Sequence, residues 1–163
     1  MYLSKHLSWS EVGCKDGTPY PAEWHDRAVA LADVFEDFRA ALGGEPIVIA
    51  SAYRTPAHNR RIGGVWHSQH VQGRALDCHP PSRMFISEFI DRAKAFAQSD
   101  DRIGGIGLYR WGVHWDLRPH TRLITWNTQS RGTSLRDTYK NKPKRLRCTR
   151  PEAADPTVNT PKG

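Results

Sequence analysis

A histidine and an aspartate stand seven residues apart in the stretch SQHVQGRALD, residues 68–77, which is otherwise rich in Gly, Arg and Gln. His70 and Asp77 are residue types that bind zinc, and a catalytic zinc needs about three protein ligands plus an open position. A third candidate, His114, lies in GVHWDLR, where a strand would place His114 and Asp116 on one face. Spacing alone leaves two interpretations open, a shared metal site or separate structural roles.

The cysteines do not form a recognisable metal or disulfide pattern. Cys14, Cys78 and Cys148 include no CxxC pair and no even set, so three reduced thiols are expected. Cys78 directly follows Asp77, but neighbouring side chains of a strand point to opposite faces. Cys78 is therefore not expected to share a metal with Asp77.

Length and composition favour one globular domain. The chain has 163 residues, of which 38% are hydrophobic and six are Trp. This composition is too aromatic for a disordered protein and too polar for a membrane protein, and no apolar run approaches the roughly 18–20 residues that span a bilayer. The N-terminus, MYLSKHLSWSEVGCKDG, has no apolar segment of a secretory signal, so synthesis in the cytosol is expected.

The net charge of +7 is unevenly distributed. Residues 131–150 carry eight Lys or Arg residues against one acid, and the final segment, PEAADPTVNTPKG, is typical of a disordered end. A basic segment favours a polyanion partner, such as an anionic cell-wall polymer, a membrane surface or nucleic acid. A solvated tail that aids solubility is the alternative. We predict a domain over residues 1–130 and a basic, partly disordered tail over residues 131–163.

An α+β domain must position these residues. Two amphipathic helices are predicted, over residues 21–42 and 83–97, from apolar side chains at helical spacing. A small antiparallel sheet is predicted from short apolar or alternating runs, with the last as an edge strand: residues 46–50, 74–79, 103–109, 112–117 and 123–126. Residues 55–66 predict a loop with a short helical turn.

Three blocks resemble a known family of peptidoglycan peptidases. SAYRTPAHNRRIGG, SQHVQGRALD and GIGLYRWGVHWDLR are similar to the blocks of the zinc D-alanyl-D-alanine carboxypeptidase and L-alanyl-D-glutamate endopeptidase family, which includes phage endolysins. The similarity is to its short single-domain branch, covers roughly residues 6–127, and extends to CKDGTPYPAEW near the N-terminus. It implies a fold of the hedgehog/D-Ala-D-Ala peptidase type, with the zinc site on the sheet and two main helices packed against it.

The resemblance also implies roles for individual residues. Zinc would be bound by His70, Asp77 and His114, with Ser68 contacting substrate and Arg54 holding the scissile carbonyl or its oxyanion. An arginine suits that role, because it stays charged and presents a planar fork of donors. Many members place an acidic general base three residues before the last zinc histidine, a position that is Trp111 here. Asp116 is then the predicted base, and its alternatives are an ion pair with Arg118 or a hydrogen bond that orients a ligand.

We therefore expect a zinc peptidase that hydrolyses amide bonds in peptidoglycan stem peptides, acting as a monomer. The absent signal segment and the basic tail favour a phage or prophage endolysin released by a holin. Two other hypotheses are a non-catalytic cell-wall-binding member of the same fold and a polyanion-binding protein led by its tail, although no specific nucleic acid is expected. D-Ala-D-Ala carboxypeptidases, L-Ala-D-Glu endopeptidases and cross-link endopeptidases share these ligands, so the sequence leaves the bond that is cut open.

Overall fold

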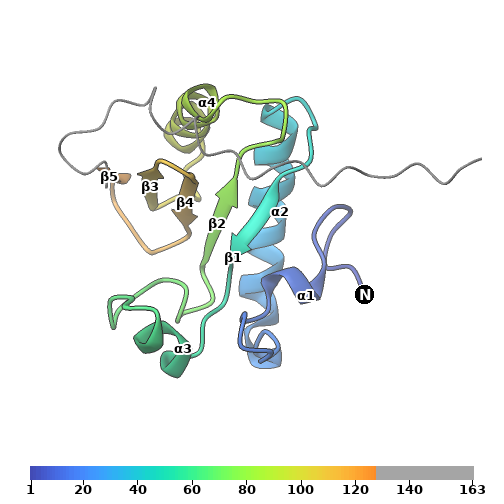
Figure 1. Ribbon diagram of the computed structural model, residues 1–163, viewed down its shortest axis with the longest axis vertical. Coiled ribbons are helices and arrows are strands. Elements are labelled where there is room, and N and C mark those ends of the chain that lie inside the picture. The colour runs from blue at the N-terminus through green and yellow to red at the C-terminus, as the bar shows by residue number, and fades with distance from the viewer. Residues whose placement is uncertain (128–163) are drawn as a thin grey trace, which may run out of the picture. The chain divides into compact units, whose positions relative to one another are not determined.

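A five-stranded mixed sheet forms the centre of residues 1–127, the part of the chain that the computed structural model describes (Figure 1). The strand order is β1-β2-β4-β3-β5. The strands are β1 (Val48–Ser51), β2 (Ala75–His79), β3 (Gly105–Tyr109), β4 (Gly112–Asp116) and β5 (Ile124–Asn127). This α+β architecture confirms the predicted fold class. The basic tail predicted for residues 131–163, with its predicted disorder, lies outside the described residues.

The predicted edge strand exists, but it makes the sheet mixed rather than antiparallel. Strands β1, β2, β4 and β3 pair antiparallel, whereas β5 pairs parallel with β3. After β4, residues 117–123 carry the chain past the start of β3. Strand β5 then pairs with β3 along the edge that faces away from β4. A β-hairpin pattern in the sequence gives no information on this choice of edge.

Two helices pack apolar side chains into the core. A 3-10 turn, η1 (Ala22–Trp24), leads into α2 (His25–Ala41), and α4 (Ile86–Ser99) follows β2. The stripe predicted on the first helix is buried: Leu31, Val34, Phe35, Phe38 and Leu42. These side chains join one cluster with the sheet residues Leu76, Cys78, Val113 and Trp115. Since side chains alternate along a strand, the neighbouring Asp77 and His114 face the opposite side of the sheet.

Two short helices complete the described part of the chain. The helical turn expected within residues 55–66 is α3 (Pro56–Arg61), capped by the Thr55 hydroxyl, which accepts from the His58 N–H at 3.1 Å. Helix α1 (Trp9–Val12) was not predicted. Its start is a capping box in which Ser8 and Glu11 bond each other's backbone, and the S-x-x-E spacing could have identified it.

None of the helices within residues 1–127 combines the length and the apolar character needed to cross a bilayer.

Candidate metal centre

One row of residues runs straight across the sheet and carries two of the three predicted ligands. In the strand register Ser51 lies opposite Asp77, Asp77 opposite His114, His114 opposite Gly107, and Gly107 opposite Trp126. A Cβ on Gly107 would lie 2.6 Å from Nε1 of Trp126, so the absence of a side chain there lets the indole lie across the sheet. The Trp126 ring then packs 5.2 Å from the imidazole of His114, centroid to centroid.

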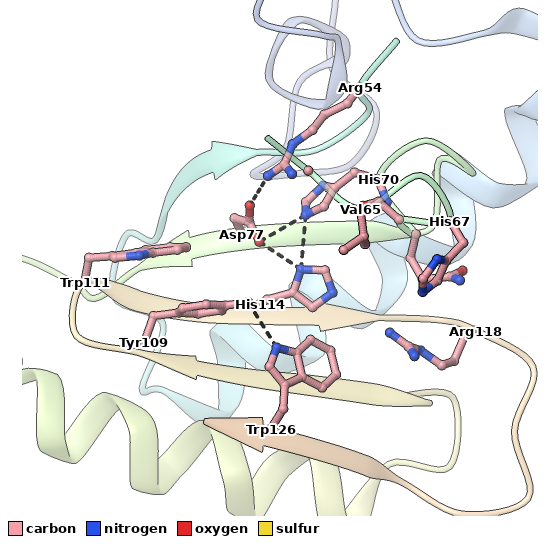
Figure 2. A pocket seen from close by; sticks show the side chains of 13 residues that line it. Arg54, Val65, His67, His70, Asp77, Tyr109, Trp111, His114, Arg118 and Trp126 are labelled. Atoms are coloured by element: carbon pink, nitrogen blue, oxygen red, sulfur yellow. Dashed lines mark hydrogen bonds and ion pairs between the residues drawn. The ribbon is translucent and has the colours of Figure 1, made fainter. Parts of the chain in front are cut away.

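The third member, His70, comes from the loop between α3 and β2 (Figure 2). The backbone of this loop is fixed to the strand exit, because the Arg54 N–H donates to the His70 carbonyl at 3.1 Å. His70 Nε2 lies 3.1 Å from Asp77 Oδ1 and 3.1 Å from His114 Nδ1, and His114 Nδ1 lies 2.9 Å from Asp77 Oδ1. The three predicted ligands are thus brought together with one atom from each facing a common centre.

Hydrogen bonds on the far side of each ring fix which nitrogen faces this centre. His70 Nδ1 lies 2.5 Å from the carbonyl oxygen of Ala52, which only accepts, so this nitrogen carries the proton. His114 Nε2 lies 2.9 Å from Oδ2 of Asp116, which again makes it the donor. In neutral imidazoles the nitrogens that face each other then have lone pairs and no proton. Three acceptor atoms therefore converge within 3.1 Å, an arrangement that requires a cation or an extra proton between them.

Burial and the neighbouring carboxylates shift the pKa values of the histidines in opposite directions. His70, Asp77 and His114 are 2%, 6% and 7% exposed, so charge on them is poorly solvated. Burial lowers the pKa of His70 despite the nearby Asp77. Burial alone would also lower the pKa of His114, but its contacts with Asp116 and Asp77 outweigh burial and raise it. The pKa of Asp77 is lowered, because hydrogen bonds from His114 and His70 overcome the effect of burial. The contacts with the two carboxylates thus favour positive charge at His114, and a cation bound among the three donors would supply such charge.

The donor set and its spacing fit zinc. Bonds of about 2.0–2.2 Å to nitrogen and oxygen in a tetrahedral arrangement separate the donors by about 3.3 Å. The observed separations of 2.9–3.1 Å need only small side-chain movements to reach that value. A backbone carbonyl and a carboxylate behind the two histidines are the partners that zinc-binding imidazoles have in proteins.

Arg54 binds the carboxylate oxygen of Asp77 that does not face the other two donors. Nη2 of Arg54 donates to Asp77 Oδ2 at 2.5 Å, and its Nε donates to the Ser51 hydroxyl at 2.9 Å. The guanidinium is therefore held in place from β1 and β2 while it lines the pocket beside the three donor atoms. Arginine was predicted here from the family pattern, and the structure adds that it fixes the orientation of Asp77.

Asp116 lies beneath His114 rather than in the pocket. It is fully buried, and it is not among the pocket-lining residues. Its Oδ2 contacts His114 Nε2 and accepts from Arg118 Nη2 at 2.6 Å, while Oδ1 accepts from Arg118 Nε at 2.7 Å. Both contacts that the sequence offered as alternatives to a general base are thus present, so the geometry favours a carboxylate that orients His114.

A pocket of about 450 Å³ opens over the three donors (Figure 2). Ser68, predicted to contact substrate, lines it, and its hydroxyl accepts from the His70 N–H at 3.3 Å. Trp111 lines the pocket, whereas Trp115 and Tyr53 are buried in the core. Trp66 is exposed and does not line it.

Several other residues line the pocket that were not predicted to do so. Arg118 follows the GVHWD strand, and Trp126 reaches the pocket from β5; their side chains pack together, with the Arg118 guanidinium 5.3 Å from the indole. Tyr109 stacks on Trp111 and accepts a hydrogen bond from Trp126 Nε1 at 3.0 Å. His67 is exposed and also lines the pocket.

Comparison with known proteins agrees with the site. A family model described as Peptidase M15 matches residues 3–116, which is more than half of the chain and includes all three donors. No curated protein matches the chain. The match confirms the family resemblance that the three sequence blocks indicate.

Proposed function

The chain belongs to the peptidase M15 family, and from that premise we propose that it is a zinc peptidase that hydrolyses amide bonds in the peptide stems of peptidoglycan. Family membership supports a zinc-dependent peptidase. The observation that carries the proposal for this chain is the convergence of three acceptor atoms, from His70, Asp77 and His114, within 3.1 Å in a buried corner of an open pocket.

The three donors would hold the ion, and the surrounding residues would present them. When bound, zinc supplies a Lewis acid and lowers the pKa of a water toward about 7. The Ala52 carbonyl and the Asp116 carboxylate keep the protons of His70 and His114 on the far sides of the rings. Arg54 keeps one oxygen of Asp77 turned toward the other donors.

Arg54 is also the residue that we propose stabilises negative charge on the substrate. An amide carbonyl that is attacked by water becomes an oxyanion, and a fixed cation beside it stabilises that charge. Arg54 lines the pocket and is fixed by Ser51 and Asp77, so its orientation is set before substrate binds. Ser68, on the same pocket wall as His70, is the proposed substrate-contacting hydroxyl.

The residues that line the pocket limit which group can accept the proton of the attacking water. Among the pocket-lining residues the one carboxylate is Asp77, which is a proposed ligand. We propose that Asp116 acts by positioning His114, and that His67 takes the proton from the attacking water and returns it to the leaving amine. With zinc saturating, His67→Gln should lower kcat more than Asp116→Asn does. The opposite ranking would return the role of base to Asp116, as the sequence predicted.

The pocket favours a short, anionic peptide. Two arginines, Arg54 and Arg118, line it, whereas Asp77 is the one carboxylate among the lining residues. Tyr109, Trp111 and Trp126 form an aromatic wall. Peptidoglycan stems carry free carboxylates and short side chains, which suit such a surface. The same chemistry is compatible with a carboxypeptidase or an endopeptidase. Action on the cell wall after holin-type release, as an endolysin, is the proposed context, with the basic segment 131–163 as the contact to anionic polymers or membrane.

Digestion of purified sacculi tests the proposal, with the released peptides and new amines identified by mass spectrometry. We expect cleavage by the wild type, none by His70→Ala, and full activity for His25→Ala, which removes an exposed histidine of α2 as a matched control. Zinc binding without any cleavage by the wild type would favour a non-catalytic cell-wall-binding protein. Equal cleavage by His70→Ala would overturn the assignment of the site.

A further inference from the structure

A second group of metal-binding residue types lies outside the pocket. One ligand atom each from Cys14, Asp16 and His58 falls within 4.8 Å of the others, and none of these residues lines the pocket of the first site. Cys14 is 6% exposed, His58 is half-buried and Asp16 is exposed, so the group forms a shallow site with a buried sulfur at its base. The proposed peptidase function makes no use of these three side chains.

The chain brings these residues together from two separate elements. Cys14 and Asp16 belong to a tight turn, in which the Gly17 N–H donates to the Cys14 carbonyl at 3.0 Å and Gly17 has a φ of 93°. That left-handed conformation favours glycine. His58 belongs to the first turn of α3, more than forty residues later in the sequence. A tether between the two elements is therefore a long-range contact.

Thr55 touches all three residues and holds the group in place. Its N–H donates to Cys14 Sγ at 3.4 Å, its hydroxyl donates to Asp16 Oδ2 at 2.7 Å, and the same hydroxyl accepts from the His58 N–H at 3.1 Å. The bond from Thr55, with a second from the Thr18 N–H at 3.0 Å, holds the pKa of Asp16 below its usual range. The carboxylate is thus ionised at neutral pH and already oriented.

The donor chemistry points to a zinc-class ion. A thiolate and a carboxylate carry two negative charges, which a divalent cation neutralises, and sulfur with imidazole favours zinc over calcium or magnesium. Bonds of about 2.0–2.3 Å place tetrahedral donors roughly 3.5 Å apart, so atoms that lie within 4.8 Å of one another would move closer on binding. Arg61 Nη2 donates to His58 Nδ1 at 2.7 Å, and binding at either ring nitrogen would end this exposed contact.

We propose that Cys14, Asp16 and His58 bind a second divalent metal ion of the zinc class, whose role is structural. The ion would join the Cys14–Gly17 turn to the start of α3. The residue between them, Thr55, directly follows Arg54, and Tyr53 N–H donates to the Val12 carbonyl at 3.1 Å. The site would therefore brace the segment from which Arg54 reaches Asp77.

Metal content of the full, untagged chain tests this proposal. After dialysis we expect two zinc ions per chain in the wild type, one in His70→Ala, one in Cys14→Ser, and none in the double variant. Arg61→Ala should keep both. One zinc in the wild type with none in His70→Ala would overturn the second site while leaving the first intact, so the failures of the two proposals are distinguishable.

Cobalt substitution identifies the sulfur ligand directly. A thiolate-to-cobalt charge-transfer band should appear in the wild type and in His70→Ala, and disappear in Cys14→Ser. Cys78→Ala, which removes the other buried thiol among the described residues, is the matched control and should keep the band. If circular dichroism shows that Cys14→Ser is unfolded, His58→Gln is used, and it should lose the same equivalent of zinc. A band that persists without Cys14, or is absent from the wild type, contradicts the proposal.

Discussion

The carboxylate of Asp116 should control zinc affinity although it does not face the pocket. It accepts from His114 Nε2 at 2.9 Å, which leaves Nδ1 free of a proton on the side of Asp77 and His70. In Asp116→Asn the amide can donate to Nε2 instead, which would move the ring proton to Nδ1 and block that ligand atom. The substitution therefore acts on the tautomer of His114 rather than on its position.

The size of the effect follows from the contacts. Loss of a hydrogen-bond partner behind a metal ligand costs about 10–100-fold in metal affinity, or about 1.4–2.8 kcal/mol. The pKa of Asp116 is lowered from 3.8 to about 2, because its hydrogen bonds from Arg118 and His114 outweigh the opposing effect of burial. That shift corresponds to about 2 kcal/mol of folding stability that the amide would lose. We expect weaker zinc binding and a lower melting temperature together.

A matched control exists within the chain. Asp100 and Arg102 have the same Asp-x-Arg spacing, and Arg102 Nε donates to Asp100 Oδ1 at 2.9 Å, but this pair lies away from the pocket. Competition with a chelating indicator should show zinc binding 10–100-fold weaker in Asp116→Asn and unchanged in Asp100→Asn. If excess zinc restores turnover, Asp116 is a positioning residue. Wild-type zinc affinity in Asp116→Asn would refute the tautomer argument.

Three further perturbations test other parts of the site. Arg54→Lys keeps the charge but loses the planar fork, so we expect zinc to be retained and kcat to fall by about 10²–10³-fold, and unchanged sacculus digestion would contradict the oxyanion role. Gly107→Ala places a Cβ 2.6 Å from Trp126 Nε1, so calorimetry should show a loss of about 1–3 kcal/mol, and an unchanged melting temperature would argue against the packed indole. The raised pKa of His114 adds stability that is present below about pH 6.5 and lost as pH rises through the folded pKa. The melting temperature of metal-free protein should therefore fall above neutral pH, whereas that of the zinc-loaded protein should not. If the two proteins show the same dependence of melting temperature on pH, zinc does not replace a proton at His114.

The parts of the site that follow a local pattern were predictable. Alternation along β4 places His114 and Asp116 on one face, and the apolar stripe of α2 identifies the side of the sheet that the core covers. The family blocks then identify His70 and Asp77 as partners of His114. The structure supports all three at a common centre.

The parts that depend on long-range pairing were not predictable. Trp126 reaches the pocket only because β5 pairs with the far edge of β3, and no local periodicity encodes that choice. The alternation of side chains along β4 also does not determine whether the Asp116 carboxylate is exposed to solvent or buried beneath the His114 imidazole. That depends on Arg118, whose bond to Asp116 closes the carboxylate off.

The most direct test of the central claim is anomalous diffraction at the zinc edge from crystals of the protein as purified. We predict an anomalous peak at the bottom of the pocket, in contact with His70 Nε2, Asp77 Oδ1 and His114 Nδ1, with Asp116 still hydrogen-bonded to His114 Nε2. Absence of a peak among these three atoms in zinc-containing crystals, or coordination of His114 through Nε2, would contradict the account.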